Sequence, residues 1–315
     1  MPDNDAEKVH TSVMLDEALS LLAPSDGGLF VDATIGMGGH TEAILLSSAD
    51  SRVIGIDQDT AALALAETRL MRFSSRVELV HGNFESIKTV VGERQPSGII
   101  ADLGVSSLQL DSETRGFSFR FDAPLDMRMD TDSGGITAAE LLESEDQDAI
   151  ANIIYQYGEE RHSRRIARRI VERRERGEAV KTTFELANLV RRSVPHSKKD
   201  KIHPATRTFQ ALRIAVNREL EIIEKFIDDA VDILKINGVL AIITFHSLED
   251  RIVKQAFQRL SGKCLCPPKI PQCMCGAKKR VEILTRKPLT ASESEQDENP
   301  RSRSAKLRAS RKIGQ

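Results

Sequence analysis

The chain of 315 residues contains no tryptophan, only two tyrosines and four cysteines, and its net charge is close to zero, at −2. All four cysteines lie between residues 264 and 275, which argues against a disulfide framework and favours the reducing cytoplasm. Long apolar runs are also missing. The longest, residues 239–245, is too short to span a bilayer, and the polar N-terminus does not resemble a secretory signal. We therefore expect a cytoplasmic protein that does not cross a membrane.

The sequence does contain enough apolar material for a sizeable core, because 40% of its residues are hydrophobic. Its length is typical of two domains. Charge is strongly segregated: residues 111–160 carry 13 acidic and 3 basic side chains, whereas residues 161–220 carry 17 basic and 6 acidic ones. The basic stretch is either a footprint for a polyanion or a set of solvated helix faces.

Short apolar runs alternate with helical patterns through the first hundred residues. We expect strands at residues 29–31, 52–57, 77–80 and 98–103, an alternation typical of an α/β fold with an open parallel sheet and helices on both faces. A fifth strand is expected at residues 239–245, after an apolar stripe at residues 209–234 that fits one long helix. Two more strands are expected at residues 281–284 and 305–309, separated by an acidic segment, residues 292–300, that should be mobile.

The strand pattern is interrupted in the middle of the chain by segments with helical composition. We predict that residues 108–205 form an inserted, all-helical domain. The sheet domain is then discontinuous and comprises residues 1–107 and 206–315.

A glycine-rich turn follows the first predicted strand, where the backbone of Gly36 and Gly38 can approach a ligand closely. The turn is not a dinucleotide fingerprint, because Thr41 occupies the position of the third glycine. Asp32 stands four residues before the first glycine, which favours a ligand with a cationic group over a pyrophosphate. A tight strand-to-helix turn without a ligand is the structural alternative.

Two further acids end predicted strands. Asp57 can accept both hydroxyls of a ribose, or it can cap the following helix, and Asp102 ends the fourth strand. Phe84 follows the third strand and can stack on an adenine or pack in the core. Three acids on one rim of a parallel sheet fit a cation that carries adenosine, and S-adenosylmethionine is the obvious one.

With these motifs the chain resembles the RsmH (MraW) family of bacterial methyltransferases. That family methylates the exocyclic N4 of a cytidine in the decoding region of 16S ribosomal RNA. The matching motifs are residues 10–14, 32–40, 102–107, 115–120, 124–130, 157–161, 203–207, 209–220 and 245–251. Together they extend through nearly the whole chain.

The resemblance implies a Rossmann-like class I methyltransferase sheet, S-adenosylmethionine as the cofactor, and the inserted domain as the element that recognises RNA. Carried over by position, the cofactor contacts of the family are Gly38, Gly39, His40, Asp57, Phe84, Asp102 and Gln109. The expected partner is 16S ribosomal RNA, either naked or within the small ribosomal subunit. Whether the chain acts as a monomer or as a homodimer stays open.

Methyl transfer from a sulfonium needs no metal, but a cytosine amino nitrogen is a poor nucleophile. The site must hold the amine in line with the methyl group and accept a hydrogen bond from it as charge builds on nitrogen. Asp102 is the first candidate for this catalytic acceptor, and the alternative is that it contacts only the cofactor. His246, after the fifth strand, is a second catalytic candidate, with a structural hydrogen bond as its alternative.

Recognition of RNA requires groups that stack on bases and hold phosphates. Phe117, Phe119 and Phe121 alternate beside arginines and could do the former, or they could pack one side of a loop. A surface that faces phosphates is expected from a second set, Arg164, Arg165, Arg168, Arg169, Arg173 and Arg174, and from the basic tail at residues 301–312.

The four cysteines form two Cys-x-Cys pairs, Cys264 with Cys266 and Cys273 with Cys275. Four thiolates could hold zinc, but the spacing within each pair is shorter than usual. Reduced structural thiols are the alternative, and the family resemblance implies no metal.

Two other functions compete with methyl transfer. A nicotinamide-dependent oxidoreductase is disfavoured by Thr41 and Asp32 in the glycine turn. A non-catalytic RNA-binding assembly factor with a vestigial pocket is disfavoured by the intact acidic rim, because a pocket that is no longer used need not keep its charges.

Overall fold

The computed structural model describes residues 12–132, 134–195, 203–264, 266, 274 and 278–314. It contains two compact units, one formed by Met1–Gly104 with Leu220–Gln315 and the other by Val105–Glu219. The first boundary lies close to the predicted position. The second lies at residues 219/220 instead of 205/206, because helix α10 (Thr206–Asn217) buries Phe209 and Leu212 in the core of the inserted unit.

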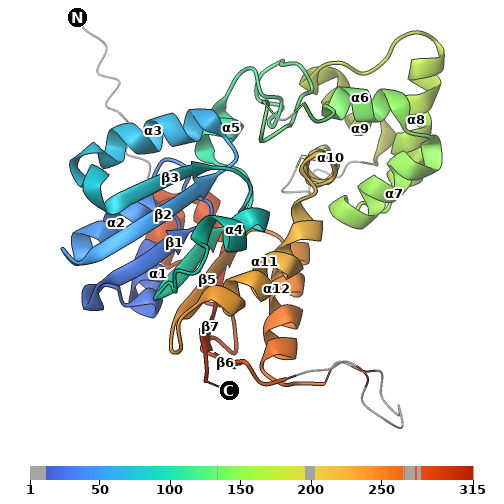
Figure 1. Ribbon diagram of the computed structural model, residues 1–315. Helices are drawn as coiled ribbons and strands as arrows, with labels where there is room; N and C mark the ends of the chain where they lie inside the picture. Colours follow the sequence, from blue (N-terminus) through green and yellow to red (C-terminus); the bar gives the residue numbers. More distant parts are fainter. Residues whose placement is uncertain are drawn as a thin grey trace, which may run out of the picture. The chain divides into compact units, whose positions relative to one another are not determined.

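The larger unit is built on a seven-stranded sheet in the order β3-β2-β1-β4-β5-β7-β6 (Figure 1). Five strands are parallel, namely β1 (Gly28–Asp32), β2 (Ser51–Asp57), β3 (Val77–His81), β4 (Gly98–Asp102) and β5 (Val239–Thr244). Strand β7 (Lys306–Lys312) is antiparallel to both β5 and β6 (Val281–Ile283). The predicted α/β, Rossmann-like fold is confirmed, and all seven strands lie close to where the sequence pattern places them.

Successive residues of the strands face opposite sides of the sheet, so each strand contributes to two cores. Phe30 packs on one side with helices α1 (Leu15–Leu22), α2 (Gly39–Ser47) and α3 (Thr60–Leu70). Its neighbour Val31 packs on the other side with α4 (Ile87–Val91), α11 (Glu219–Ile233) and α12 (Ser247–Leu260). Packing on both faces explains why the strands are almost continuously apolar and why their polar residues gather at the ends.

Short elements complete this unit: η1 (Pro24–Asp26), η2 (Met71–Arg76), η3 (Phe84–Ser86), η4 (Pro300–Ser304) and α13 (Glu293–Glu298). Most of the acidic segment at residues 292–300, which was expected to be mobile, forms α13. The side chain of Ser292 accepts a hydrogen bond from the N–H of Glu295 and caps α13. The Glu295 carboxylate in turn accepts a hydrogen bond of 2.7 Å from the N–H of Met14, which is completely buried.

The inserted unit is helical, as predicted. Besides α10 it contains α5 (Ser107–Asp111), α6 (Ala138–Ser144), α7 (Gln147–Gly158), α8 (Ser163–Glu175) and α9 (Thr183–Ser193). One core of its own holds these helices together, with Ile150, Ile166 and Leu186 completely buried. Across the ranges that the structure describes, no helix of either unit is both long and apolar enough to cross a membrane.

The apolar stripe at residues 209–234 predicts one helix, but the structure has two, α10 and α11. The chain turns at Arg218, which adopts a left-handed conformation with φ 52°. Asn217 fixes the end of α10, because its side chain accepts a hydrogen bond from the N–H of Met129 and donates one to the carbonyl of Met127. The apolar residues of α11 continue the three- and four-residue spacing of those in α10. The spacing alone therefore cannot reveal that the helix is interrupted.

Candidate functional site

Three carboxylates end neighbouring strands of the sheet: Asp32 on β1, Asp57 on β2 and Asp102 on β4 (Figure 1). These strands are parallel, so their carboxyl ends lie at one edge, which is where open α/β sheets bind ligands. The charges of Asp57 and Asp102 both interact with that of Asp32. The structure therefore brings together the acidic rim that the sequence predicts.

The glycine turn between β1 and α2 is fixed to the end of β2 by Asp57. Gly36, with φ 53°, donates its N–H to Oδ2 of Asp57 at 2.8 Å, and Asp59 donates its N–H to Oδ1 at 2.9 Å. Gly38 precedes α2 with φ 81°, and a Cβ on Gly39 would collide with Oγ of Ser12. Each glycine thus meets a requirement of backbone angle or space, while one carboxylate holds the turn in place.

Asp32 is buried, with 1% of its surface exposed. It accepts a hydrogen bond of 2.8 Å from the hydroxyl of Thr41 and a longer one of 3.4 Å from the N–H of Thr34. Burial raises the pKa of Asp32 from 3.8 to about 6, although these hydrogen bonds act in the opposite direction. A cation bound at the rim would favour the ionised form of this carboxyl.

Asp102 is held differently. Its backbone N–H donates to Oγ1 of Thr34 at 2.6 Å, but its side-chain Oδ1 is buried and has no hydrogen-bond partner within the described ranges. Burial raises the pKa of Asp102 well above its usual value, and the charges of Asp32 and Glu249 raise it further. A buried acceptor without a partner is costly, so a polar group of a ligand is the expected partner of Oδ1.

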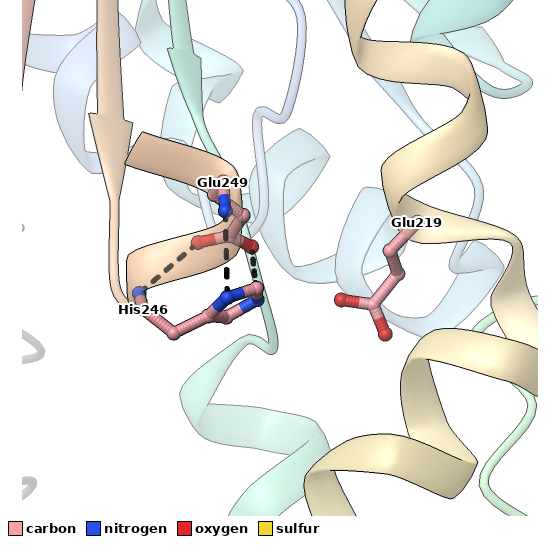
Figure 2. Close-up of side chains that lie close together, drawn as sticks. All are labelled: Glu219, His246 and Glu249. Carbon is pink, nitrogen blue, oxygen red and sulfur yellow. Dashed lines mark hydrogen bonds and ion pairs between the residues drawn. The ribbon is translucent and has the colours of Figure 1, made fainter. Parts of the chain in front are cut away.

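His246 follows β5 and caps helix α12. Its Nδ1 accepts a long hydrogen bond of 3.5 Å from the N–H of Glu249, and its Nε2 lies 3.1 Å from Oε1 of the same residue (Figure 2). Oε2 of Glu249 accepts the N–H groups of Phe245 and His246, and the Glu249 side chain is buried. Nδ1 of His246 therefore serves as the cap, which is the structural alternative considered for this residue, whereas the buried Nε2 has no hydrogen-bond partner within the described residues.

Figure 2 also draws Glu219, which belongs to the inserted unit. Within that unit its carboxylate accepts two hydrogen bonds of 2.9 Å from the guanidinium of Arg213.

The other predicted cofactor contacts have structural partners. His40 lies buried on α2 with Nε2 3.1 Å from the carbonyl of Val13, and Phe84 packs its ring edge on Phe226 at 5.0 Å. Gln109 belongs to the inserted unit, where it forms a capping box with Ser106 at the start of α5. Their contacts with a cofactor stay predictions.

Sequence reasoning missed three residues of this site: Thr34, Thr41 and Glu249. Thr34 lies in the glycine turn and Thr41 in the first turn of α2, but only the fold shows which acid each one contacts. Glu249 was detectable, because a glutamate three residues after a capping residue is the signature of a capping box. Histidine in the capping position concealed the pattern.

Some of the aromatic and basic residues expected to contact RNA pack within the protein, and others are exposed. Phe117 is buried, and Phe119 packs against Phe209 with ring centroids 5.0 Å apart, whereas Phe121 is exposed. Arg174 donates to three carbonyls at the end of α6, so it is a structural residue and not a free cation. Cys273 and Cys275 lie outside the described residues, which leaves the proposed zinc ligands without a structural test.

Comparison with known proteins adds the following. The model of the MraW methylase family matches residues 7–313. A "Ribosomal RNA small subunit methyltransferase H" from Citrifermentans bemidjiense is 48% identical over 309 residues, covering 96% of this chain and 98% of the relative. A protein with the same name from Syntrophotalea carbinolica is 50% identical with the same coverage. Among solved structures, an rRNA methylase from Streptococcus thermophilus has a TM-score of 0.43 at 13% identity and covers 95% of each chain, a similarity too weak to bear on function.

Proposed function

The chain belongs to the MraW methylase family, and we propose that it methylates the exocyclic N4 of a cytidine in the decoding region of small-subunit ribosomal RNA. Membership confirms the resemblance drawn from the sequence motifs, and with it a methyltransferase that uses S-adenosylmethionine. The names of the relatives support ribosomal RNA as the substrate. The choice of N4 and of the decoding region rests on the motif resemblance.

The residues at the rim fit this cofactor. When bound, S-adenosylmethionine supplies a methyl group that is already activated by a positive sulfur. Each oxygen of Asp57 accepts one N–H and keeps a lone pair for a ribose hydroxyl. The turn leaves room for close approach, since a Cβ on Gly36 would meet only the carbonyl of Thr34, at 4.0 Å. The concentration of negative charge at Asp32, Asp57 and Asp102 favours a cation.

The buried Oδ1 of Asp102 is the observation that carries the proposal. It offers an acceptor for an amino N–H at the edge where a cationic donor would be bound, and this contact would orient the nitrogen lone pair. Positive charge builds on the amine as the methyl group arrives, so a hydrogen bond to a carboxylate strengthens at that moment.

The raised pKa of Asp102 is suited to accepting the proton that the methylated amine must lose. Burial and the neighbouring acids raise this pKa, whereas a cation beside the carboxylate lowers it. A bound cation therefore favours the ionised form of Asp102, and loss of that charge favours the binding of a proton at Oδ1. Methyl transfer removes the positive charge from the sulfur at the same moment as the methylated amine must lose a proton, and Asp102 is then better able to accept it.

The inserted unit is the proposed element for RNA recognition, because the basic stretch of the chain lies in it. The acidic rim supports catalysis over a non-catalytic assembly role. The glycine turn does not support a nicotinamide cofactor.

The test is to incubate the protein with S-adenosylmethionine labelled in the methyl group, offering small-subunit ribosomal RNA either naked or within the assembled subunit. Nuclease digestion and mass spectrometry then locate the label. We expect N4-methylcytidine in the decoding region with at least one of the two substrates. Label on a ring carbon or a ribose, or no label in either substrate, would overturn the proposal.

A further inference from the structure

Helices α8 and α9 of the inserted unit line an open groove with a volume of about 770 Å³. The groove is strongly charged and contains five arginines and four carboxylates. The arginines are Arg168, Arg169, Arg173, Arg176 and Arg192. It plays no part in the acidic rim, and all of its residues lie within one unit.

Two of the arginines are neutralised within the protein. Arg173 donates to the carboxylate of Glu185 at 3.0 Å, and Arg168 lies 3.7 Å from that of Glu172. Glu185 also accepts the N–H groups at the start of α9, so both of its carboxylate oxygens already have hydrogen-bond partners within the protein. These pairs account for half of the negative charge in the groove.

The remaining three arginines form no such pair. Within the residues that the structure describes, Arg169, Arg176 and Arg192 have neither an ion pair nor a hydrogen bond through their guanidinium groups. Arg176 and Arg192 are exposed and Arg169 is half-buried, so all three can reach an anion in the groove. Guanidinium groups without a carboxylate partner are suited to hold phosphates.

An exposed aromatic ring completes the arrangement. Phe184, in the first turn of α9, lines the same groove with 41% of its surface exposed. Its backbone N–H donates to Oδ1 of Asp122 at 3.3 Å, which anchors the main chain at the start of the helix. A ring of this size exposed beside cations offers a base a surface for stacking.

We propose that this groove binds a single-stranded segment of the RNA substrate, with phosphates on Arg169, Arg176 and Arg192 and a base stacked on Phe184. Unpaired guanidinium groups next to an exposed aromatic ring are the combination that single-stranded nucleic acid requires. An acidic peptide would use the arginines but would gain nothing specific from the ring. Only the identity of the RNA rests on the proposed function.

The charge part of the proposal is tested with two triple variants that lose the same charge. One combines Arg169→Gln, Arg176→Gln and Arg192→Gln. The other combines Arg52→Gln, Arg191→Gln and Arg286→Gln, three exposed arginines that lie outside the groove. Binding of a single-stranded fragment of small-subunit RNA is measured over a range of salt concentrations, and thermal unfolding verifies that both variants fold.

We expect the groove variant to bind about 10–100-fold more weakly and the slope of log K against log[salt] to fall by about 2, since each phosphate contact contributes roughly 0.7. The matched variant should change affinity by less than about threefold. Equal losses in the two variants would mean that only net charge matters, and no loss in the groove variant would mean that RNA does not bind there. Either result overturns the proposal.

The stacking part uses the absence of tryptophan from the chain. A Phe184→Trp variant has a single indole, whose emission should be quenched by single-stranded RNA and unchanged by an acidic peptide. Tyr155→Trp is the control, because Tyr155 is 57% exposed on α7 outside the groove. Phe184→Ala should weaken RNA binding by about fivefold or more, as loss of one stacked base predicts. RNA binding without quenching, or equal quenching by the peptide, would contradict the stacked base.

Methylation assays separate failure of this inference from failure of the proposed function. If the unaltered protein methylates small-subunit RNA and the groove variant binds that RNA normally, the groove inference is wrong and the function stands. If single-stranded RNA quenches the Phe184→Trp variant but no ribosomal RNA is methylated, the groove stands and the function is wrong.

Discussion

The N–H of Gly36 donates a hydrogen bond of 2.8 Å to Oδ2 of Asp57, and this bond joins the turn after β1 to the end of β2. Asp57 thus holds the glycine turn in place, and in the proposed function it would also offer lone pairs to a ribose. Its removal should act mainly on cofactor binding, because the sheet below it is packed on both faces.

We expect Asp57→Ala to weaken S-adenosylmethionine binding by roughly 10–100-fold, as the loss of hydrogen bonds to a charged group predicts. Isothermal titration calorimetry provides the measurement. Glu67→Ala is the matched control, because Glu67 is an exposed acid on α3, the helix that follows β2. Unchanged affinity in Asp57→Ala would remove Asp57 from the cofactor site.

Asp102→Asn should lower the rate of methyl transfer by about 100-fold or more, the range typical of a lost general base or acceptor. The amide keeps the size of the side chain but cannot take up the proton. S-adenosylmethionine affinity should fall much less, by less than about tenfold, because one of several acidic charges is lost. Single-turnover kinetics combined with calorimetry separates the two effects, and equal losses in both would return Asp102 to a role in cofactor binding alone.

Much of the fold could be predicted from the sequence, because strands that are packed on both faces are almost continuously apolar and can be recognised as such. A short apolar run that ends in an acid, such as the one ending at Asp32, is typical of a buried strand. The end of α10 could not be predicted in the same way. Its turn depends on Asn217 bonding to residues almost ninety positions away, and a contact of that kind leaves no local pattern.

In the candidate site, too, some features could be predicted from the sequence and others could not. The positions of Asp32, Asp57 and Asp102 at strand ends could be predicted, because parallel strands bring their ends together. Their protonation could not, because the pKa of Asp32 depends on burial and on Thr41, nine positions away. The capping role of His246 was one of two alternatives, and only the position of Glu249 favours it.

Binding of S-adenosylmethionine should strengthen as the pH rises from about 5 to 7. The pKa of Asp32 in the unliganded protein is about 6, and a bound cation favours its ionised form, so protons are released on binding in this range. S-adenosylhomocysteine, whose sulfur is neutral, should show a weaker dependence. Calorimetry of both ligands between pH 5 and pH 8 measures the difference, and parallel pH profiles would show that the rim does not sense the sulfur charge.

Asp32→Asn should stabilise the unliganded protein at neutral pH. The folded state holds the Asp32 proton more tightly than the unfolded state, with a pKa of about 6 against 3.8, so stability falls as the pH rises through this interval. Keeping Asp32 ionised at pH 7 then costs about 3 kcal/mol, as an upper limit for the gain on substitution. The amide can still bond with the Thr41 hydroxyl, which is also an acceptor.

Thermal unfolding at pH 7 and pH 3.5 tests this linkage. The melting temperature of Asp32→Asn should exceed that of the unaltered protein at pH 7, and the difference should become small at pH 3.5, where Asp32 is mostly protonated in both folded and unfolded states. Asp50→Asn, at an exposed position, serves as the control. A lower melting temperature for Asp32→Asn at pH 7 would mean that its hydrogen bonds outweigh the desolvation of the charge.

Replacement of His246 distinguishes a cap from a catalytic acceptor. His246→Ala removes the side chain that accepts the N–H of Glu249, and loss of an N-cap costs about 1 kcal/mol. His246→Asn supplies one of the best capping residues and should restore the melting temperature. Because Nδ1 of His246 serves as the cap of α12, we expect His246→Asn to keep its methyl-transfer rate within about threefold, whereas loss of an acceptor would lower it by about 100-fold. A variant that is as stable as the original and yet inactive would give His246 a direct part in the reaction.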